Sequence, residues 1–220
     1  MIKLPNFNKA FEHENSFYLS CDISRIGKII THYELYKMAK EIPGEIIECG
    51  VFKGASLTRF ATFQKLLGTQ LSKKVIGFDT FGKFPKTQFS KDKNPRKRFL
   101  DVAGEYSISK KQLMKVLKHK KLDTLVELVE GDITKTVPSY LNSHPKLRIS
   151  LLNLDVDIYE PSVTILKYFY PKITKGGVLI LDDYGKFPGE TKAVDDYFKS
   201  QNIEIKKFPF CITPCYIIKK

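Results

Sequence analysis

Short apolar runs alternate with longer segments of helical periodicity along most of this chain. The runs have the length of buried strands, and the segments between them repeat polar and apolar positions at the spacing of amphipathic helices. Strand, crossover helix and strand in succession predict a parallel sheet with helices on both faces. Two last runs, 203–208 and 216–218, predict an antiparallel hairpin. The predicted strands are 45–49, 75–79, 125–130, 149–154 and 177–181, and the predicted helices are 23–40, 55–67, 109–120, 134–142, 191–200 and one that starts near Pro161.

This pattern predicts an α/β fold of three layers, with a mostly parallel sheet and a C-terminal antiparallel hairpin. At 220 residues the chain has the length of one domain, and we expect a single domain over 1–220. Two segments, 1–40 and 80–108, are expected to act as lids or substrate-binding segments. The second is rich in lysine, proline, glycine and phenylalanine and shows no regular pattern. A long segment of this kind inside a compact domain is usually functional or mobile.

The composition narrows the classes of function. Lysine and arginine number 37 against 24 aspartate and glutamate residues, which gives a net charge of +13. Most of these cations are lysines, which are poorly suited to recognise individual nucleic-acid bases. The excess of positive charge therefore favours a solvated surface, or a field that attracts anionic small molecules, over specific nucleic-acid recognition. No stretch approaches the roughly 20 apolar residues that span a bilayer, and no secretion signal is evident, so we expect a cytoplasmic location. Neither a disulfide nor a zinc site is expected from the spacing of Cys21, Cys49, Cys211 and Cys215.

Acidic residues follow two of the predicted strands at the point where each strand ends. Asp155 and Asp157 follow the run 149–154, and Asp182 and Asp183 follow the run 177–181. The carboxyl ends of parallel strands meet at one edge of the sheet, which is where α/β proteins bind ligands. Asp155 and Asp157 would point to the same side of an extended chain and raise each other's pKa unless a cation lay between them. Because Mg²⁺ prefers such oxygen ligands, the pattern favours a metal-assisted enzyme over capping of turns by aspartate.

A glycine-rich turn joins the first predicted strand to the next helix. Gly50 and Gly54 would let a ligand approach the backbone at the positive end of that helix, although tight strand-to-helix packing demands the same glycines. The spacing differs from the GxGxxG dinucleotide fingerprint and so disfavours NAD. Asp79 ends the second strand, where a carboxylate accepts from ribose hydroxyls or caps the following turn. The Gly131–Asp132 pair offers a carboxylate beside a nucleoside pocket or simply forms a turn.

The four histidines give no recognisable catalytic arrangement with serine, cysteine or aspartate. His119 lies among lysines and His144 precedes a proline in a loop, so both are expected to be solvated. His13 and His32 belong to the N-terminal segment, where a role in the site stays open.

Six segments in consistent order resemble the macrocin O-methyltransferase (TylF) family of S-adenosylmethionine-dependent enzymes. The resemblance spans about residues 42–200 and implies a Rossmann-like class I methyltransferase sheet and an Mg²⁺-dependent O-methyltransferase that acts on sugar hydroxyls, often within glycosylated natural products. The basic segment 83–98 departs in composition from what the family leads us to expect. The matching segments are 47–56, 77–82, 131–138, 154–160, 176–185 and 192–198.

The resemblance also implies roles for individual residues. The methyl donor would lie over Glu48, Gly50 and Gly54, with Asp79 on its ribose and Asp132 near its adenine. Asp157 would be the general base. The further residues implied are Ser56, Thr80, Phe81 and Gly131 for donor binding, and Asp155, Asp182 and Asp183 for the metal.

Two alternatives remain at this stage. A catechol- or phenol-type O-methyltransferase uses the same metal chemistry, but those enzymes usually carry a lysine soon after the first metal aspartate, where this chain has Ile158 and Tyr159. A non-catalytic, basic nucleic-acid-binding protein on the same scaffold is the second, although carboxylates at the mouth of the site would repel phosphates. The expected partner is a small sugar-containing acceptor that carries a negative charge, and the resemblance also suggests a homodimer.

Overall fold

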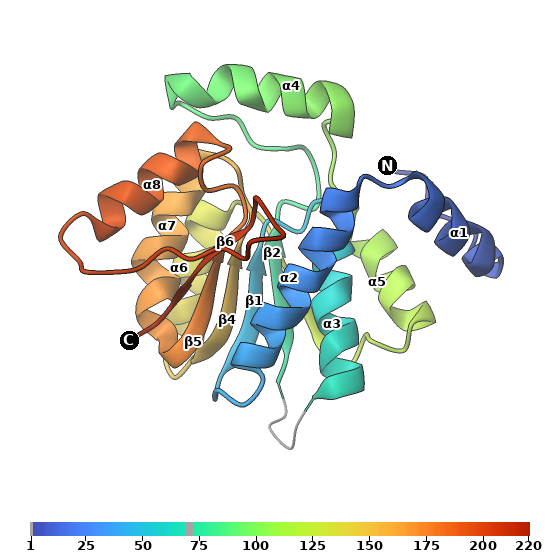
Figure 1. Ribbon diagram of the computed structural model, residues 1–220, viewed down its shortest axis with the longest axis horizontal. Helices are drawn as coiled ribbons and strands as arrows, with labels where there is room; N and C mark the ends of the chain where they lie inside the picture. Colours follow the sequence, from blue (N-terminus) through green and yellow to red (C-terminus); the bar gives the residue numbers. More distant parts are fainter. Residues whose placement is uncertain (1, 69–72) are drawn as a thin grey trace.

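A six-stranded sheet lies at the centre of the protein, in the order β3-β2-β1-β4-β5-β6 (Figure 1). In this computed structural model, which describes residues 2–68 and 73–220, the first five strands are parallel and β6 is antiparallel to β5. The predicted fold class, a mostly parallel α/β sheet, is confirmed. The strands are β1 (Glu45–Cys49), β2 (Val75–Asp79), β3 (Val126–Glu130), β4 (Ile149–Leu154), β5 (Ile173–Leu181) and β6 (Cys215–Ile218).

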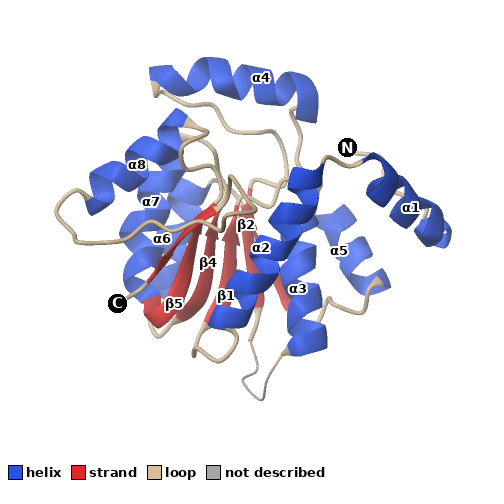
Figure 2. Cartoon of the chain, in the orientation of Figure 1, coloured by secondary structure: helices blue, strands red, loops and turns tan. Residues whose placement is uncertain are grey.

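Helices cover both faces of the sheet and complete three layers (Figure 2). The helices α2, α3 and α5 pack on one face, α6, α7 and α8 pack on the other, and α4 lies across the carboxyl edge, while α1 projects to one side (Figure 1). Within the described part of the chain, no helix is long and apolar enough to cross a bilayer. The helices are α1 (Ala10–Ser20), α2 (Ile23–Ala39), α3 (Ala55–Leu67), α4 (Lys93–Ala103), α5 (Lys110–His119), α6 (Ile133–Ser143), α7 (Tyr159–Phe169) and α8 (Pro188–Phe198), with short 3-10 helices η1 (Phe7–Lys9), η2 (Ser90–Asp92) and η3 (Tyr170–Lys172).

The strands are apolar throughout because both of their faces are buried. Ile46 and Leu151 belong to the core beneath α2 and α3, whereas the next residues, Ile47 and Leu152, belong to the core beneath α6 and α7. Successive side chains of a strand point to opposite faces, so a sheet covered on both sides needs apolar residues at every position. This burial explains why the strand runs are uninterrupted in the sequence.

Two segments differ from the sequence-based expectation. The residues 93–103 form the regular helix α4, although the sequence predicted no regular structure there. Pro95 lies in the first turn of this helix, where a missing backbone N–H is tolerated, so the proline does not prevent helix formation. In the predicted C-terminal hairpin, β6 forms as expected, but the segment 203–208 pairs with it through a single bridge between Lys206 and Tyr216.

Two carboxylates, one of them buried, attach the segment before α4 to the body of the protein. Asp92 is fully buried and accepts hydrogen bonds from the backbone N–H groups of Tyr159 (2.9 Å) and Gly189 (2.7 Å), which lie in the first turns of α7 and α8. Gly189 has no room for a side chain, because a Cβ atom there would lie 2.0 Å from Asp92 Oδ2. Conversely, Glu160 of α7 accepts a hydrogen bond from the segment, from the backbone N–H of Gln88 (2.6 Å). The segment that carries α4 is therefore attached to the N-terminal ends of two helices.

Replacement of Asp92 by alanine should lower the free energy of unfolding by about 2–4 kcal/mol, because two backbone N–H groups would lose their acceptor. Chemical denaturation followed by circular dichroism measures this change. The control is Asp101→Ala on the exposed side of α4, which should change the free energy of unfolding by less than about 0.5 kcal/mol. Equal effects of the two substitutions would contradict the anchoring role of Asp92.

Candidate active site

A cavity of about 1300 Å³ opens at the carboxyl edge of the sheet. Its walls come from the segments that follow each of the strands β1 to β5, from the first turns of α2, from the segment 83–107 that includes α4, and from residues 210–213. Most of the residues that the sequence singled out line this cavity, but Glu48, Gly54, Phe81 and Gly131 do not. Those that line it are Gly50, Ser56, Asp79, Thr80, Asp132, Asp155, Asp157, Asp182 and Asp183.

The glycines of the first turn have backbone reasons for their identity. Gly50 has a φ of +94°, and a Cβ atom there would lie 1.6 Å from the carbonyl oxygen of Asp155. Gly54 has a φ of +82° at the N-cap of α3, and its missing side chain makes room for Leu113. The tight packing considered from the sequence is therefore present, and it brings the end of β1 directly against the end of β4.

Asp79 and Asp132 organise loops at the cavity wall. One Asp79 oxygen accepts from the backbone N–H groups of Val51 and Phe52, both at 3.0 Å, and the other accepts from Phe81 N at 2.6 Å. Asp132 is the N-cap of α6 and accepts from Thr134 N at 2.9 Å. The capping roles considered from the sequence are thus present in the structure, and both carboxylates also face the cavity.

Three carboxylates converge at the centre of the cavity. Asp155, Asp157 and Asp183 each offer an oxygen, and these oxygens lie within 4.8 Å of one another. The convergence does not arise from an extended chain, as was expected from the sequence. Asp157 has a φ of +61° and is the central residue of a tight turn in which Ile158 N donates to Val156 O. A non-glycine residue in this left-handed region is strained unless its surroundings hold it there.

Burial raises the pKa values of all three carboxyl groups. The pKa of Asp157 rises to about 7, mainly because the group is buried. Burial and the neighbouring Asp182 raise the pKa of Asp155 well above its usual range, and burial and Asp157 do the same for Asp183. The structure therefore gathers negative charge at a place where water cannot fully solvate it.

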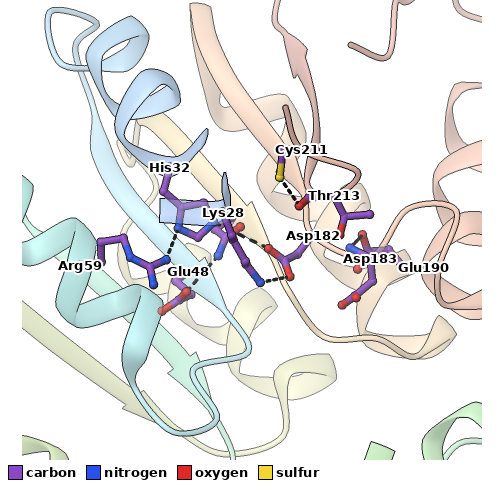
Figure 3. Close-up of polar contacts among 10 residues, drawn as sticks. Lys28, His32, Glu48, Arg59, Asp182, Asp183, Glu190, Cys211 and Thr213 are labelled. Carbon is purple, nitrogen blue, oxygen red and sulfur yellow. Dashed lines mark hydrogen bonds and ion pairs between the residues drawn. The ribbon is translucent and has the colours of Figure 1, made fainter. Parts of the chain in front are cut away.

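Asp182 differs from these three carboxylates because it has a cation as its partner (Figure 3). Its Oδ2 atom accepts a hydrogen bond from Nζ of Lys28, a residue of α2, at 2.5 Å. Burial alone would raise the pKa of Asp182, but the Lys28 ammonium holds it at about 2. Of the three aspartates that the sequence assigned to a metal, Asp155 and Asp183 belong to the convergent group, whereas Asp182 is paired with a lysine.

A buried polar chain continues behind Asp182 (Figure 3). His32 is fully buried, with its Nε2 atom 3.8 Å from Asp182 Oδ1 and its Nδ1 atom 2.9 Å from Arg59 Nη1. Because a guanidinium only donates, Nδ1 must accept, and the neutral ring carries its proton on Nε2, toward Asp182. Burial lowers the pKa of His32 to about 4, in agreement with a neutral ring. Glu48 is buried beside this chain and accepts from Asn153 Nδ2 at 2.9 Å.

Most residues of this buried polar chain were not predicted from the sequence. Lys28 and His32 lie four residues apart in α2 and therefore share one helical face, so their spacing could have indicated a polar patch facing the sheet. Arg59 and Glu190 carried no comparable pattern. Glu190 is fully buried in α8 and accepts from the backbone N–H of Asp183 at 3.0 Å, which fixes the chain next to the carboxylate group.

Four phenylalanines form an apolar wall around the outer part of the cavity. Phe99 of α4 packs against Phe52, Phe84 and Phe187, with ring centroids 5.3, 5.7 and 6.2 Å apart. These rings come from three different loops and from α4. The outer cavity thus combines aromatic surface with the lysines of the same loops, including Lys86 and Lys186.

Comparison with known proteins agrees with this geometry. The family model described as macrocin-O-methyltransferase (TylF) matches residues 29–209. Two curated relatives are a demethyldecarbamoylnovobiocin O-methyltransferase from Streptomyces niveus, at 25% identity, and an 8-demethyl-8-(2,3-dimethoxy-alpha-L-rhamnosyl)-tetracenomycin-C 4'-O-methyltransferase from Streptomyces olivaceus, at 26% identity. Each match covers 73% of this chain and 60% of the relative, so the chain spans about 60% of the length of these proteins.

The solved structures of the calicheamicin methyltransferase CalS11 are similar over most of the chain. One has a TM-score of 0.76 at 28% identity and covers 94% of this chain and 84% of its own. A second, described as the apo form of a TDP-rhamnose 3'-O-methyltransferase, has a TM-score of 0.68 at 27% identity and covers 95% of this chain and 86% of its own. With a family model that matches well over half of its residues, this chain belongs to the macrocin-O-methyltransferase (TylF) family.

Proposed function

We propose that this chain is an S-adenosylmethionine-dependent, Mg²⁺-assisted O-methyltransferase that acts on a hydroxyl group of a sugar or of a glycosylated small molecule. The observation that carries the proposal is the convergence of Asp155, Asp157 and Asp183 in a cavity next to the Gly50 turn. Family membership supports methyl transfer, and the names of two relatives, which mention a rhamnosyl group and TDP-rhamnose, support a sugar acceptor.

The cavity has the features that the methyl donor requires. The donor is proposed to lie along the carboxyl edge, with its adenine near Asp132, its ribose at Asp79 and Thr80, and its sulfonium near Gly50 and Ser56. All five of these residues line the cavity. Glu48, Gly54, Phe81 and Gly131 are proposed to shape this wall from behind, because none of them lines the cavity itself.

The cluster of three carboxylates is suited to bind a hard divalent cation. Asp155 and Asp183 are proposed to hold Mg²⁺, since carboxylate oxygens at this separation are suitable ligands and their negative charges need compensation. Asp182 remains the third proposed ligand, and in this structure its carboxylate forms an ion pair with Lys28. When bound, Mg²⁺ would supply Lewis acidity that lowers the pKa of the acceptor hydroxyl.

The remaining chemistry is assigned to side chains of this protein. Asp157 is proposed to accept the proton of the acceptor hydroxyl while the oxygen attacks the methyl carbon of the donor. The new oxygen–carbon bond forms as the carbon–sulfur bond breaks, and the sulfonium becomes the neutral thioether S-adenosylhomocysteine. The phenylalanine wall around Phe99 would exclude water and pack on the apolar face of the sugar. Lys86 and Lys186 would suit an acceptor that carries a negative charge.

Incubation with S-adenosylmethionine, Mg²⁺ and a panel of acceptors tests the proposed reaction. Nucleotide-linked deoxysugars, free sugars and glycosylated natural products form the panel, with a catechol for comparison. We expect S-adenosylhomocysteine and an acceptor heavier by one methylene group, detected by liquid chromatography and mass spectrometry. Transfer to the catechol alone would contradict the sugar assignment.

The Asp157→Asn variant should keep its affinity for the donor but lose at least about 100-fold in turnover, since the amide cannot take up the proton. Asparagine tolerates the left-handed backbone at this position, so the fold should be preserved. Calorimetry and turnover measurements compare this variant with Asp123→Asn, a control outside the cavity. Unchanged turnover in Asp157→Asn would remove this residue from the mechanism.

Without metal, the free energy of unfolding should decrease as the pH rises from 6 to 8. Asp157 and Glu48 have folded-state pKa values of about 7, above their unfolded values, so the folded protein binds more protons in this range and loses stability as they leave. The lowered pKa of His32 acts in the opposite direction but mainly below pH 6.5. The net loss from these three groups should be roughly 2 kcal/mol, and the raised pKa values of Asp155 and Asp183 act in the same direction.

Added Mg²⁺ should reverse this loss and stabilise the protein more at pH 8 than at pH 6, because metal ligands must be deprotonated. Denaturant titrations with EDTA or with Mg²⁺ provide the measurement, and Asp157→Asn should flatten the metal-free pH dependence. A metal-free protein that gains stability between pH 6 and 8 would contradict this electrostatic account.

A further inference from the structure

Glu190 is a buried acidic residue for which the proposed reaction gives no role. It is the third residue of α8, is fully buried, and lies next to Asp183 (Figure 3). A buried carboxylate beside other carboxylates costs free energy, and packing alone would be served better by an apolar side chain. The hydrogen bonds of Glu190 must therefore explain why an acidic residue occupies this position.

These hydrogen bonds differ from ordinary capping of a helix. In a capping box, the glutamate at the third helical position accepts from the backbone N–H of the N-cap residue. The N-cap residue of α8 is Phe187, and its N–H donates to the carbonyl oxygen of Asp183 at 2.9 Å. The Glu190 side chain reaches Asp183 itself, whose backbone N–H donates to Oε1 at 3.0 Å. Glu190 thus holds a member of the cluster of three carboxylates.

The backbone of Glu190 holds a second member of this cluster. Its N–H donates to the carbonyl oxygen of Asp157 at 3.2 Å. Asp157 has a φ of +61°, a conformation that persists only where the surroundings hold it. The converging oxygens of Asp157 and Asp183 lie within 4.8 Å of each other. One residue of α8 therefore connects the segment after β4 to the segment after β5, and these two segments carry the cluster.

The first turn of α8 is itself fixed in place. Gly189, the residue before Glu190, donates its backbone N–H to Asp92 Oδ1 at 2.7 Å. A Cβ atom at Gly189 would lie 2.0 Å from Asp92 Oδ2 and 2.5 Å from the backbone nitrogen of Tyr159. This turn therefore packs directly against the start of α7. Because its own position is fixed, Glu190 can determine where Asp183 lies.

We propose that Glu190 is a positioning residue for the divalent-cation site, and that its hydrogen bond from the Asp183 N–H sets the separation of Asp183 and Asp157. The inference rests on the proposed binding of Mg²⁺. Groups that orient metal ligands fix them before the ion binds, and their removal typically costs about 10- to 100-fold in affinity. Glu190 does not line the cavity, so it acts through Asp183 and not directly on the ion, the donor or the acceptor.

Two substitutions of similar size separate the hydrogen bond from packing. Glu190→Gln keeps an oxygen acceptor for the Asp183 N–H, whereas Glu190→Met removes it. Calorimetric titration of Mg²⁺ into each folded protein is performed at pH 8, because metal ligands must be deprotonated. Glu190→Met should lower the affinity for Mg²⁺ by about 10- to 100-fold, and Glu190→Gln should stay within about threefold of the wild type.

The affinity for S-adenosylhomocysteine serves as an internal control. Both variants should keep the wild-type affinity, because the donor is proposed to lie over the ends of other strands, whereas a general structural defect would lower both affinities. The matched control variant is Glu160→Met. Glu160 lies in the first turn of α7 and also accepts from a backbone N–H, that of Gln88. Its replacement should leave the affinity for Mg²⁺ unchanged.

Amide hydrogen exchange of the metal-free protein, followed by NMR spectroscopy, measures the contact itself. The Asp183 amide should be protected in the wild type and in Glu190→Gln. In Glu190→Met it should exchange at least about 10-fold faster, as expected for the loss of one hydrogen bond. Unprotected exchange of this amide in the wild type would overturn the role of Glu190 even if neither variant folds.

The outcomes distinguish this inference from the proposed function. A folded Glu190→Met variant that binds Mg²⁺ as tightly as the wild type would overturn the inference and leave the proposed function intact. Equal losses in Glu190→Gln and Glu190→Met would also overturn it, because the effect would then come from the charge and not from the hydrogen bond. A folded wild-type protein that does not bind Mg²⁺ would contradict the metal-assisted function on which the inference rests.

Discussion

Repulsion among buried carboxylates is the constraint on which the rest of this structure depends. Four aspartates gather at the carboxyl edge, and the protein treats them in two ways. Asp182 receives an internal cation, because Lys28 donates to it at 2.5 Å. Among the described residues, no lysine or arginine lies within 4.0 Å of Asp155, Asp157 or Asp183, whose oxygens are within 4.8 Å of one another. Three carboxylates without a cation favour protonation or an external metal ion.

The fold brings these groups together through close backbone contacts. Gly50 allows the end of β1 to touch the backbone of Asp155, and the left-handed conformation of Asp157 turns its side chain toward Asp183. On the outer side, Asp92 attaches the segment that carries α4 to α7 and α8. The charged centre is therefore enclosed by rigid strand ends below and by an anchored aromatic wall above, an arrangement that suits transfer of a group away from water.

Much of this arrangement could be predicted from the sequence, because strand ends follow from uninterrupted apolar runs. The runs ending at Leu154 and Leu181 predicted where Asp155 and Asp183 would meet, and the structure brings them together. The turn at Asp157 could not be predicted, since its conformation depends on contacts with α8 such as the bond from Glu190 N. The pairing of Lys28 with Asp182 joins residues 154 positions apart, and no local pattern reports such a contact. The helix α4 was missed because the segment 80–108, rich in lysine, proline, glycine and phenylalanine, shows no regular pattern, although its Pro95 lies in the first turn of the helix.

We propose that the carboxyl edge of this sheet binds the methionine nucleosides and that the three carboxylates beside them hold a divalent cation. Calorimetric titration of S-adenosylhomocysteine into the purified protein, with NAD⁺ as the comparison ligand and with or without Mg²⁺, provides the test. We expect micromolar binding of S-adenosylhomocysteine and none of NAD⁺. A demonstrably folded sample that fails to bind S-adenosylhomocysteine under either condition would contradict this proposal.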